Sequence, residues 1–130
     1  MKRTGKPKKL KKKTVPEKTI QTEILSYLET TGLLFWRQNS GRIPVPTGRI
    51  GRGGKPVFRM VKLGTEGLPD IIAVVPPDGR FVGLEVKSAI GVLRPAQEAF
   101  RDQLVGSGGL YYVVRSVTDV KAALKEVIGA

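Results

Sequence analysis

Asp70, Glu85 and Lys87 are the residues of this sequence whose types and spacing could carry out chemistry. Two carboxylates that lie close together repel each other, and a cation between them relieves the repulsion. Carboxylate oxygens favour Mg²⁺ or Mn²⁺. Such an ion polarises a phosphate and lowers the pKa of a bound water. The Lys87 ammonium could then orient that water or offset charge that develops on the phosphoryl oxygens.

These residues depend on a predicted β-hairpin. Ile71–Val75 is an apolar strand that Asp70 opens, Pro76–Gly79 is a turn, and Phe81–Lys87 is the returning strand. Asp70 and Glu85 are about equally far from the turn, so we expect cross-strand neighbours roughly 5 Å apart. The alternative is that Glu85 and Lys87 form an ordinary Glu-x-Lys pair that is exposed to solvent and has no role in a site.

Glu85 and Lys87 stand two residues apart and therefore share a face of their strand. The helix before the sheet begins at Thr19, where an apolar stripe sets in, and ends at Gly32. Glu23 lies within that stripe and is expected to point inward and complete the site. The alternative is a residue at the edge of the stripe that pairs with a lysine.

Gln97 is the second supporting residue. Pro95 starts another helix, in which Gln97 lies in the first turn beside the inner stripe of Ala96, Phe100 and Leu104. A helix N-terminus at this place would also favour an anion such as phosphate. The alternative is a surface glutamine.

The remaining elements complete one mixed sheet flanked by helices, an α/β fold. Further strands are predicted at Leu33–Arg37, Val57–Lys62 and Leu110–Val114. Ser116 to Asp119 resembles a capping box, which starts a last helix. Residues 17–130 therefore form one domain.

Residues 39–56 are predicted to be a long loop rich in glycine and arginine. The loop contains basic residues and no acidic ones, which suits contact with phosphates. A solvated insertion without a binding role is the alternative.

The net charge of +12 is concentrated at the N-terminus, because nine of the 23 Lys/Arg residues lie within residues 1–18 beside Glu17 alone. Residues 1–16 are expected to be a disordered tail that attracts a polyanion. The alternative is a solubilising or ribosome-like extension.

Several classes of function are excluded by composition. The 130 residues include no cysteine and no histidine, so disulfides, thiolate zinc sites and Ser-His or Cys-His catalysis are absent. The longest apolar run, Ile71–Val75, is far too short to span a membrane. No apolar segment follows the basic N-terminus, so we expect no secretory signal and an intracellular protein in the cytoplasm of a bacterium or a phage-infected host.

From about Glu17 to Asp119 the sequence resembles the virus-type replication-repair nuclease (VRR-NUC) domain, a branch of the PD-(D/E)xK superfamily. The matching segments are Gln21–Glu23, Phe35–Gly41, Gly67–Asp70, Gly83–Lys87, Gly91–Gln97 and Tyr112–Ser116.

The resemblance implies a restriction-endonuclease-like αβββαβ core and dependence on Mg²⁺ or Mn²⁺. It implies Asp70, Glu85 and the Val86 carbonyl as metal ligands and Lys87 as the catalytic lysine, with Glu23 and Gln97 completing the site. It also implies a homodimer that cuts Holliday junctions, as in phage and bacterial members that consist of this domain alone. The DNA-binding residues we predict are Arg37, Asn39, Arg42, Arg49, Arg52, Lys55 and Arg59.

The leading hypothesis is an endonuclease that hydrolyses phosphodiester bonds of branched or flapped DNA in replication, recombination or repair. A non-catalytic nucleic-acid-binding protein on a nuclease-like scaffold is the alternative, although it would be expected to have lost one of Asp70, Glu85 and Lys87. A ribosome-associated basic protein explains the tail but not the carboxylates.

Overall fold

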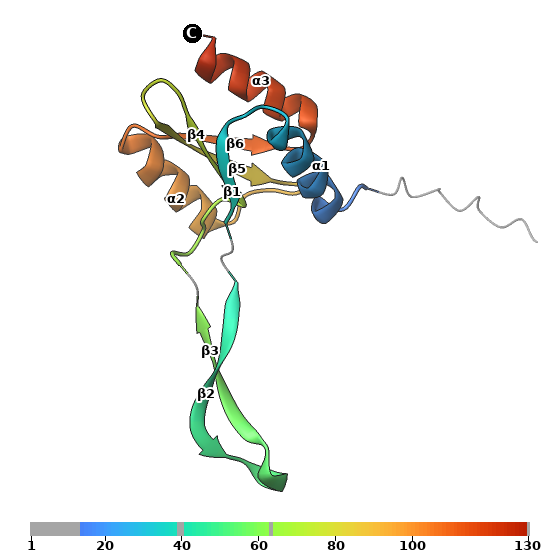
Figure 1. Ribbon diagram of the computed structural model, residues 1–130, viewed down its shortest axis with the longest axis vertical. Coiled ribbons are helices and arrows are strands. Elements are labelled where there is room, and N and C mark those ends of the chain that lie inside the picture. Colours follow the sequence, from blue (N-terminus) through green and yellow to red (C-terminus); the bar gives the residue numbers. More distant parts are fainter. Residues whose placement is uncertain (1–13, 39–40, 63, 130) are drawn as a thin grey trace, which may run out of the picture.

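A computed structural model describes residues 14–38, 41–62 and 64–129 of the chain. Its centre is a four-stranded mixed sheet in the order β1-β4-β5-β6 (Figure 1). The first three strands of that order pair antiparallel, and β5 and β6 pair parallel. The strands are β1 (Leu34–Arg37), β4 (Ile71–Val75), β5 (Arg80–Val86) and β6 (Leu110–Val114).

Helices cover both faces of this sheet. On one face, α1 (Glu17–Glu29) and α3 (Val117–Ile128) pack side by side over the apolar core (Figure 1). The stripe Ile20, Ile24 and Leu28 of α1 is buried there. The third helix, α2 (Pro95–Gly106), contacts β6 and reaches the opposite face through Gln97. The sheet therefore has an apolar face under α1 and α3 and a second face on which polar groups meet.

The α/β fold with a mixed sheet is confirmed. The strands β4 and β6 and the start of α2 lie where the sequence predicts them. The Ser116 hydroxyl accepts a hydrogen bond from the Asp119 N–H and so caps α3 as predicted. The first helix begins two residues earlier than predicted, at Glu17.

The predicted loop 39–56 is wrong for its described part. Residues 41–62, which we call the arm, form a twisted two-stranded ribbon that projects from the body (Figure 1). Its strands β2 (Arg42–Ile50) and β3 (Pro56–Lys62) are joined by a 3₁₀ turn, Arg52–Gly54. Prolines 44 and 46 disguised the first strand. Proline lacks an N–H and so cannot donate in a ladder. Because the two prolines stand at alternate positions, the residues between and before them, Val45 and Ile43, can still pair with β3.

Residues 1–13 of the predicted disordered tail lie outside the described residues. Within the described part of the chain, every helix is too short or too polar to cross a bilayer.

Candidate active site

Asp70 and Glu85 face each other across the β4–β5 hairpin. Ile71 pairs with Leu84, so the next position of the ladder sets Asp70 opposite Glu85, as the sequence predicts. Both side chains point away from the apolar face, because residues 71, 73, 82 and 84 lie in the core. The backbone N–H of Val86 donates a hydrogen bond of 2.9 Å to Asp70 Oδ2, which fixes this carboxylate against β5.

Glu85 is a buried carboxylate with one oxygen left over. Only 3% of the residue is exposed. Its Oε1 accepts a 2.8 Å hydrogen bond from the Gln97 amide and lies 3.6 Å from the Lys87 ammonium. Its Oε2 has no hydrogen-bond partner among the described residues. A buried anionic oxygen without a partner is costly, so it calls for a proton or a cation.

Lys87 follows β5 directly and is also buried, with 5% of the residue exposed. Its backbone N–H donates to the Val114 carbonyl at 3.1 Å and extends the pairing with β6. The loop after it is held by Arg115, whose guanidinium donates to the carbonyls of Ser88 and Gly91. The ammonium is therefore fixed beside the carboxylates rather than free in solvent.

Gln97 is buried, so its alternative as a surface glutamine is wrong. Its Oε1 accepts a 2.9 Å hydrogen bond from the Arg94 backbone N–H, at the start of α2. Its Nε2 donates to Glu85. The side chain thus joins the N-terminus of α2 to the carboxylate pair. In contrast, Ala96 of the predicted inner stripe is exposed, and Phe100 and Leu104 are half-buried.

The electrostatics of the pair follow from burial. Burial, together with the charge of Asp70, raises the pKa of Glu85 to about 8, although Lys87 partly opposes both. Burial also raises the pKa of Asp70, against the lowering effect of the Val86 N–H. Near neutral pH the pair therefore retains a proton unless a cation replaces it.

The pair fits a hard divalent cation. Two adjacent carboxylates with one unpartnered buried oxygen supply oxygen ligands of the kind that Mg²⁺ and Mn²⁺ take, and these ions keep several waters. Within residues 14–38, 41–62 and 64–129, no three Asp, Glu, His or Cys side chains cluster as a ready metal cage. Other oxygens would then complete the coordination shell of the ion, and the Val86 carbonyl as a ligand stays a prediction.

Glu23 is not the acidic residue that α1 brings to the site. It is exposed and lines a shallow hollow with Arg115 and Ser116, so the predicted inward position is wrong. Glu17 lies at the site instead. Its charge raises the pKa of Asp70. A Cβ on Gly91 would lie 3.3 Å from Glu17 Oε1 and 3.3 Å from Lys87 Cδ, so both side chains approach the same glycine.

The sequence could have indicated Glu17, but the predicted helix start at Thr19 left this residue outside the helix. The buried stripe of α1 runs through residues 20, 24 and 28, and one turn back at i−3 it reaches residue 17. Tyr111 was missed too. It pairs with Gly83, and its hydroxyl is buried without a partner among the described residues. Burial and then the charges of Glu85 and Asp70 raise its pKa.

The comparison with known families decides the assignment. The model of one family, described as the VRR-NUC domain, matches residues 16–118. The chain belongs to the VRR-NUC family. Comparisons with curated proteins and with solved structures gave no match.

A VRR-NUC domain is a nuclease-type domain that acts on DNA. The matched range contains Glu17, Asp70, Glu85, Lys87 and Gln97, together with the whole arm. It ends at the start of α3, which nevertheless packs against α1 and β6. The carboxylate pair of this VRR-NUC domain is therefore built entirely within the part of the chain that defines the family.

The predicted DNA-binding residues of the VRR-NUC domain fall into two places. Arg37 ends β1 and pairs with Ile71, one residue from Asp70. Asn39 lies outside the described residues. The others lie on the arm and not beside the carboxylates: Arg42, Arg49, Arg52, Lys55 and Arg59.

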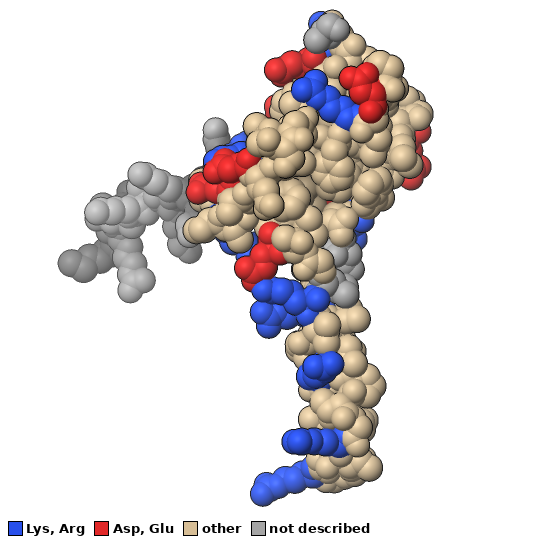
Figure 2. Space-filling view, turned by 90° about the vertical axis from the view of Figure 1, so that its left-hand side faces the viewer, with Lys and Arg blue, Asp and Glu red and all other residues tan. Residues whose placement is uncertain are grey.

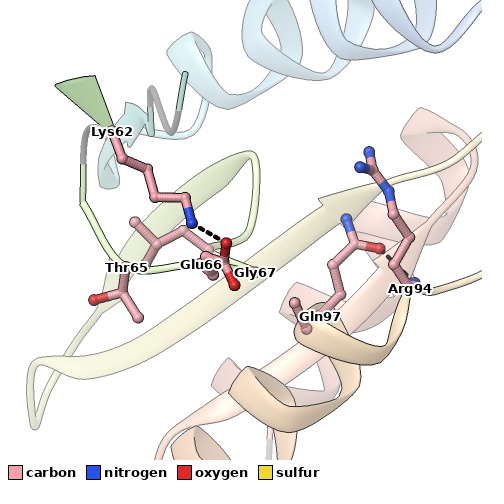
Figure 3. A pocket seen from close by; sticks show the side chains of 8 residues that line it. Lys62, Thr65, Glu66, Gly67, Arg94 and Gln97 are labelled. Carbon is pink, nitrogen blue, oxygen red and sulfur yellow. Dashed lines mark hydrogen bonds and ion pairs between the residues drawn. The ribbon is translucent and has the colours of Figure 1, made fainter. Parts of the chain in front are cut away.

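A hollow of about 250 Å³ lies between the base of the arm and α2 (Figure 3). Lys62 forms an ion pair with Glu66 on one wall, and Gln97 and Arg94 form the other. Because Gln97 also holds Glu85, this hollow joins the arm to the carboxylate site.

Gly67 makes the close packing at this hollow possible. Its φ is +78°, and a Cβ there would lie 2.1 Å from the Ala96 carbonyl oxygen. Only glycine lets the segment before Asp70 lie this close to the start of α2.

Proposed function

We propose that this VRR-NUC domain is a Mg²⁺- or Mn²⁺-dependent endonuclease that hydrolyses phosphodiester bonds of branched or flapped DNA. The observation that carries the proposal is the Asp70–Glu85 pair, in which Asp70 is half-buried and Glu85 is buried with an unpartnered oxygen, and the Lys87 ammonium lies beside it. A buried charge cluster of this kind is expensive to maintain, and functional sites are where such clusters concentrate.

In the proposed reaction, a water oxygen attacks phosphorus, one P–O ester bond breaks, and the leaving oxygen takes up a proton. The products are a phosphomonoester and a hydroxyl end. A bound Mg²⁺ or Mn²⁺ ion would supply Lewis-acid polarisation of the phosphate.

The chain's own residues prepare this geometry. The Val86 N–H holds Asp70 in place, and the Gln97 amide holds Glu85. Both carboxylates are thus oriented before DNA arrives, which lowers the reorganisation needed during reaction. The Lys87 side chain lies next to the site, where it can orient the attacking water or stabilise charge on the phosphoryl oxygens.

The test is a cleavage assay with Mg²⁺ or Mn²⁺ on a linear duplex, a flap and a four-way junction. We expect wild type to cut the branched substrates and Asp70→Ala to cut none, while both bind DNA equally. Asp78→Ala is the matched control, because Asp78 is exposed at the opposite end of the same hairpin. Equal DNA binding with no cleavage by wild type would instead support the non-catalytic alternative.

Two finer parts of the proposal have separate tests. Preference for branched DNA predicts that the junction and flap are cut faster than the linear duplex of the same sequence. A homodimer predicts twice the chain mass in sedimentation equilibrium. A monomer that cuts junctions would remove the dimer and leave the nuclease.

A further inference from the structure

The arm has an apolar face that the body leaves uncovered. The described strands β2 and β3 pair only with each other, in a sheet separate from the central one. A lone two-stranded ribbon is marginally stable in water. The arm projects away from the helices and the central sheet (Figure 1). It therefore offers both of its faces to a partner.

The register sorts the arm residues onto these two faces. Pro44 pairs with Met60 and Pro46 with Phe58, so all four share one face. Phe58 is 51% exposed and Met60 57% exposed. The opposite face contains the half-buried Val45 and Val61. We call the first set, Pro44, Pro46, Phe58 and Met60, the wedge face.

The charge of the arm identifies the class of partner. The arm contains six basic residues and no acidic one: Arg42, Arg49, Arg52, Lys55, Arg59 and Lys62. Figure 2 shows Lys and Arg side chains along one edge of the arm as far as its tip, with no acidic side chain on the arm in that view. A second copy of the chain would bring six like charges to the same place, so self-association of arms is opposed by repulsion. A polyanion is favoured.

An apolar face between cations fits DNA whose bases can be reached. Arginines and lysines bind the phosphates of any duplex. Phenylalanine, methionine and proline side chains, in contrast, act on DNA by inserting between base steps or by contacting unstacked bases. Continuous duplex resists this insertion, because unstacking costs energy, whereas a junction, flap or gap already has interrupted stacking.

We infer that the wedge face contacts bases where stacking is interrupted, and that the arm's cations hold the duplex beside that point. The arm thereby selects discontinuous DNA for the carboxylate site. This inference rests on the proposed function only for its link to cleavage, since binding and unstacking need no metal.

The test measures binding and base unstacking by the full chain without divalent metal. The probes are a gapped duplex and a matched continuous duplex, each with 2-aminopurine at the same position next to the gap site. We expect wild type to raise the fluorescence of the gapped probe and to bind it more tightly. The variant Phe58→Ala/Met60→Ala should abolish the fluorescence rise and weaken binding to the gapped probe roughly 10- to 100-fold. Its affinity for continuous duplex should change less than about twofold.

Two further variants separate contact from folding. Ile43→Ala/Val57→Ala alters the opposite face of the same ribbon and should leave the fluorescence rise intact. Phe58→Trp should restore it, since the ring can still stack. A loss of affinity that is equal for both probes would overturn the inference, as would an equal loss in Ile43→Ala/Val57→Ala.

The remaining outcomes are also decisive. A change from dimer to monomer in Phe58→Ala/Met60→Ala with an unaltered fluorescence rise would assign the wedge face to a second copy instead. A fluorescence rise without cleavage in Mg²⁺ would support the wedge face while refuting the endonuclease. Cleavage of junctions without any fluorescence rise would do the reverse.

Discussion

The body and the arm of this VRR-NUC domain place their residues in opposite ways. In the body, charged groups are buried: Glu85 and Lys87 are almost fully covered, and each is held by hydrogen bonds or backbone pairing. In the arm, apolar groups such as Phe58 and Met60 are exposed. Both placements cost free energy in the isolated molecule.

The contrast indicates a division of labour. A buried, fixed charge cluster suits chemistry, because its groups need little reorganisation during reaction. An exposed apolar ribbon between cations suits recognition, because its free-energy cost is relieved only when a partner covers it. Each of the following experiments changes one region and measures whether the other responds.

The largest effect is expected from Lys87→Met, which removes the buried ammonium and preserves the length of the chain. Cleavage of a flap should fall about 100- to 1,000-fold under single-turnover conditions, because one group that stabilises developing charge is lost. DNA binding through the arm should be unchanged. If cleavage falls less than about threefold, Lys87 has no role in the chemical step.

Two glycines with the same backbone conformation compare the regions directly. Gly67 in the body has φ +78°, and a Cβ added there would clash with the Ala96 carbonyl. Gly53 in the arm has φ +76°, and a Cβ added there would have no neighbour within 4 Å. Gly67→Ala should lower the free energy of unfolding by about 3 kcal/mol, from conformational strain and the clash together. Gly53→Ala should lower it by only about 1 kcal/mol. Urea denaturation measures both, and equal losses would contradict the close packing at Gly67.

The stability of the metal-free protein should fall as the pH rises. Because the pKa of Glu85 is about 8 in the folded chain, the folded state keeps a proton that the unfolded chain has already released above its ordinary pKa. The contribution is complete below that ordinary value and is lost as the pH passes through 8.

We expect a decline on the order of 4 kcal/mol in the free energy of unfolding between about pH 5 and pH 8.5. Adding Mg²⁺ should reverse the decline at high pH. Glu85→Gln serves as the control and should remove most of the dependence. A profile that is the same for wild type and Glu85→Gln would show that Glu85 is not the titrating group.

The smallest effect is expected from the acidic residues of α1. Glu17→Gln should slow cleavage about tenfold, because a carboxylate beside the site is lost. It should also shift the pH profile of cleavage to lower pH, because the Glu17 charge raises the pKa of Asp70. Glu23→Gln, exposed on the same helix, should leave cleavage within about twofold of wild type. A larger loss of cleavage in Glu23→Gln than in Glu17→Gln would instead support the sequence-based prediction that Glu23 completes the site. Initial cleavage rates at several pH values measure both variants.

Local patterns in the sequence predicted the body well and the arm poorly. The apolar run Ile71–Val75 and the turn after it are enough to fix the register that joins Asp70 to Glu85. The burial of Gln97 could not be predicted, because it depends on where α2 meets a strand far away in the chain. The second strand of the arm, Val57–Lys62, was predicted and is confirmed as β3. The first strand was missed because its register is set by only one partner strand, and prolines and glycines obscure the alternation of side chains.

The arm enters and leaves the body at one point. Arg37 and Ile71 are cross-strand partners, and the Gln38 N–H donates to the Asp70 carbonyl at 2.7 Å, so the arm is an insertion between two paired strands, β1 and β4. The central strands keep their register whatever the length of this insertion. The roles proposed here for substrate choice and for bond cleavage thus fall on stretches that can vary separately, and an exchanged ribbon would meet an unaltered carboxylate site.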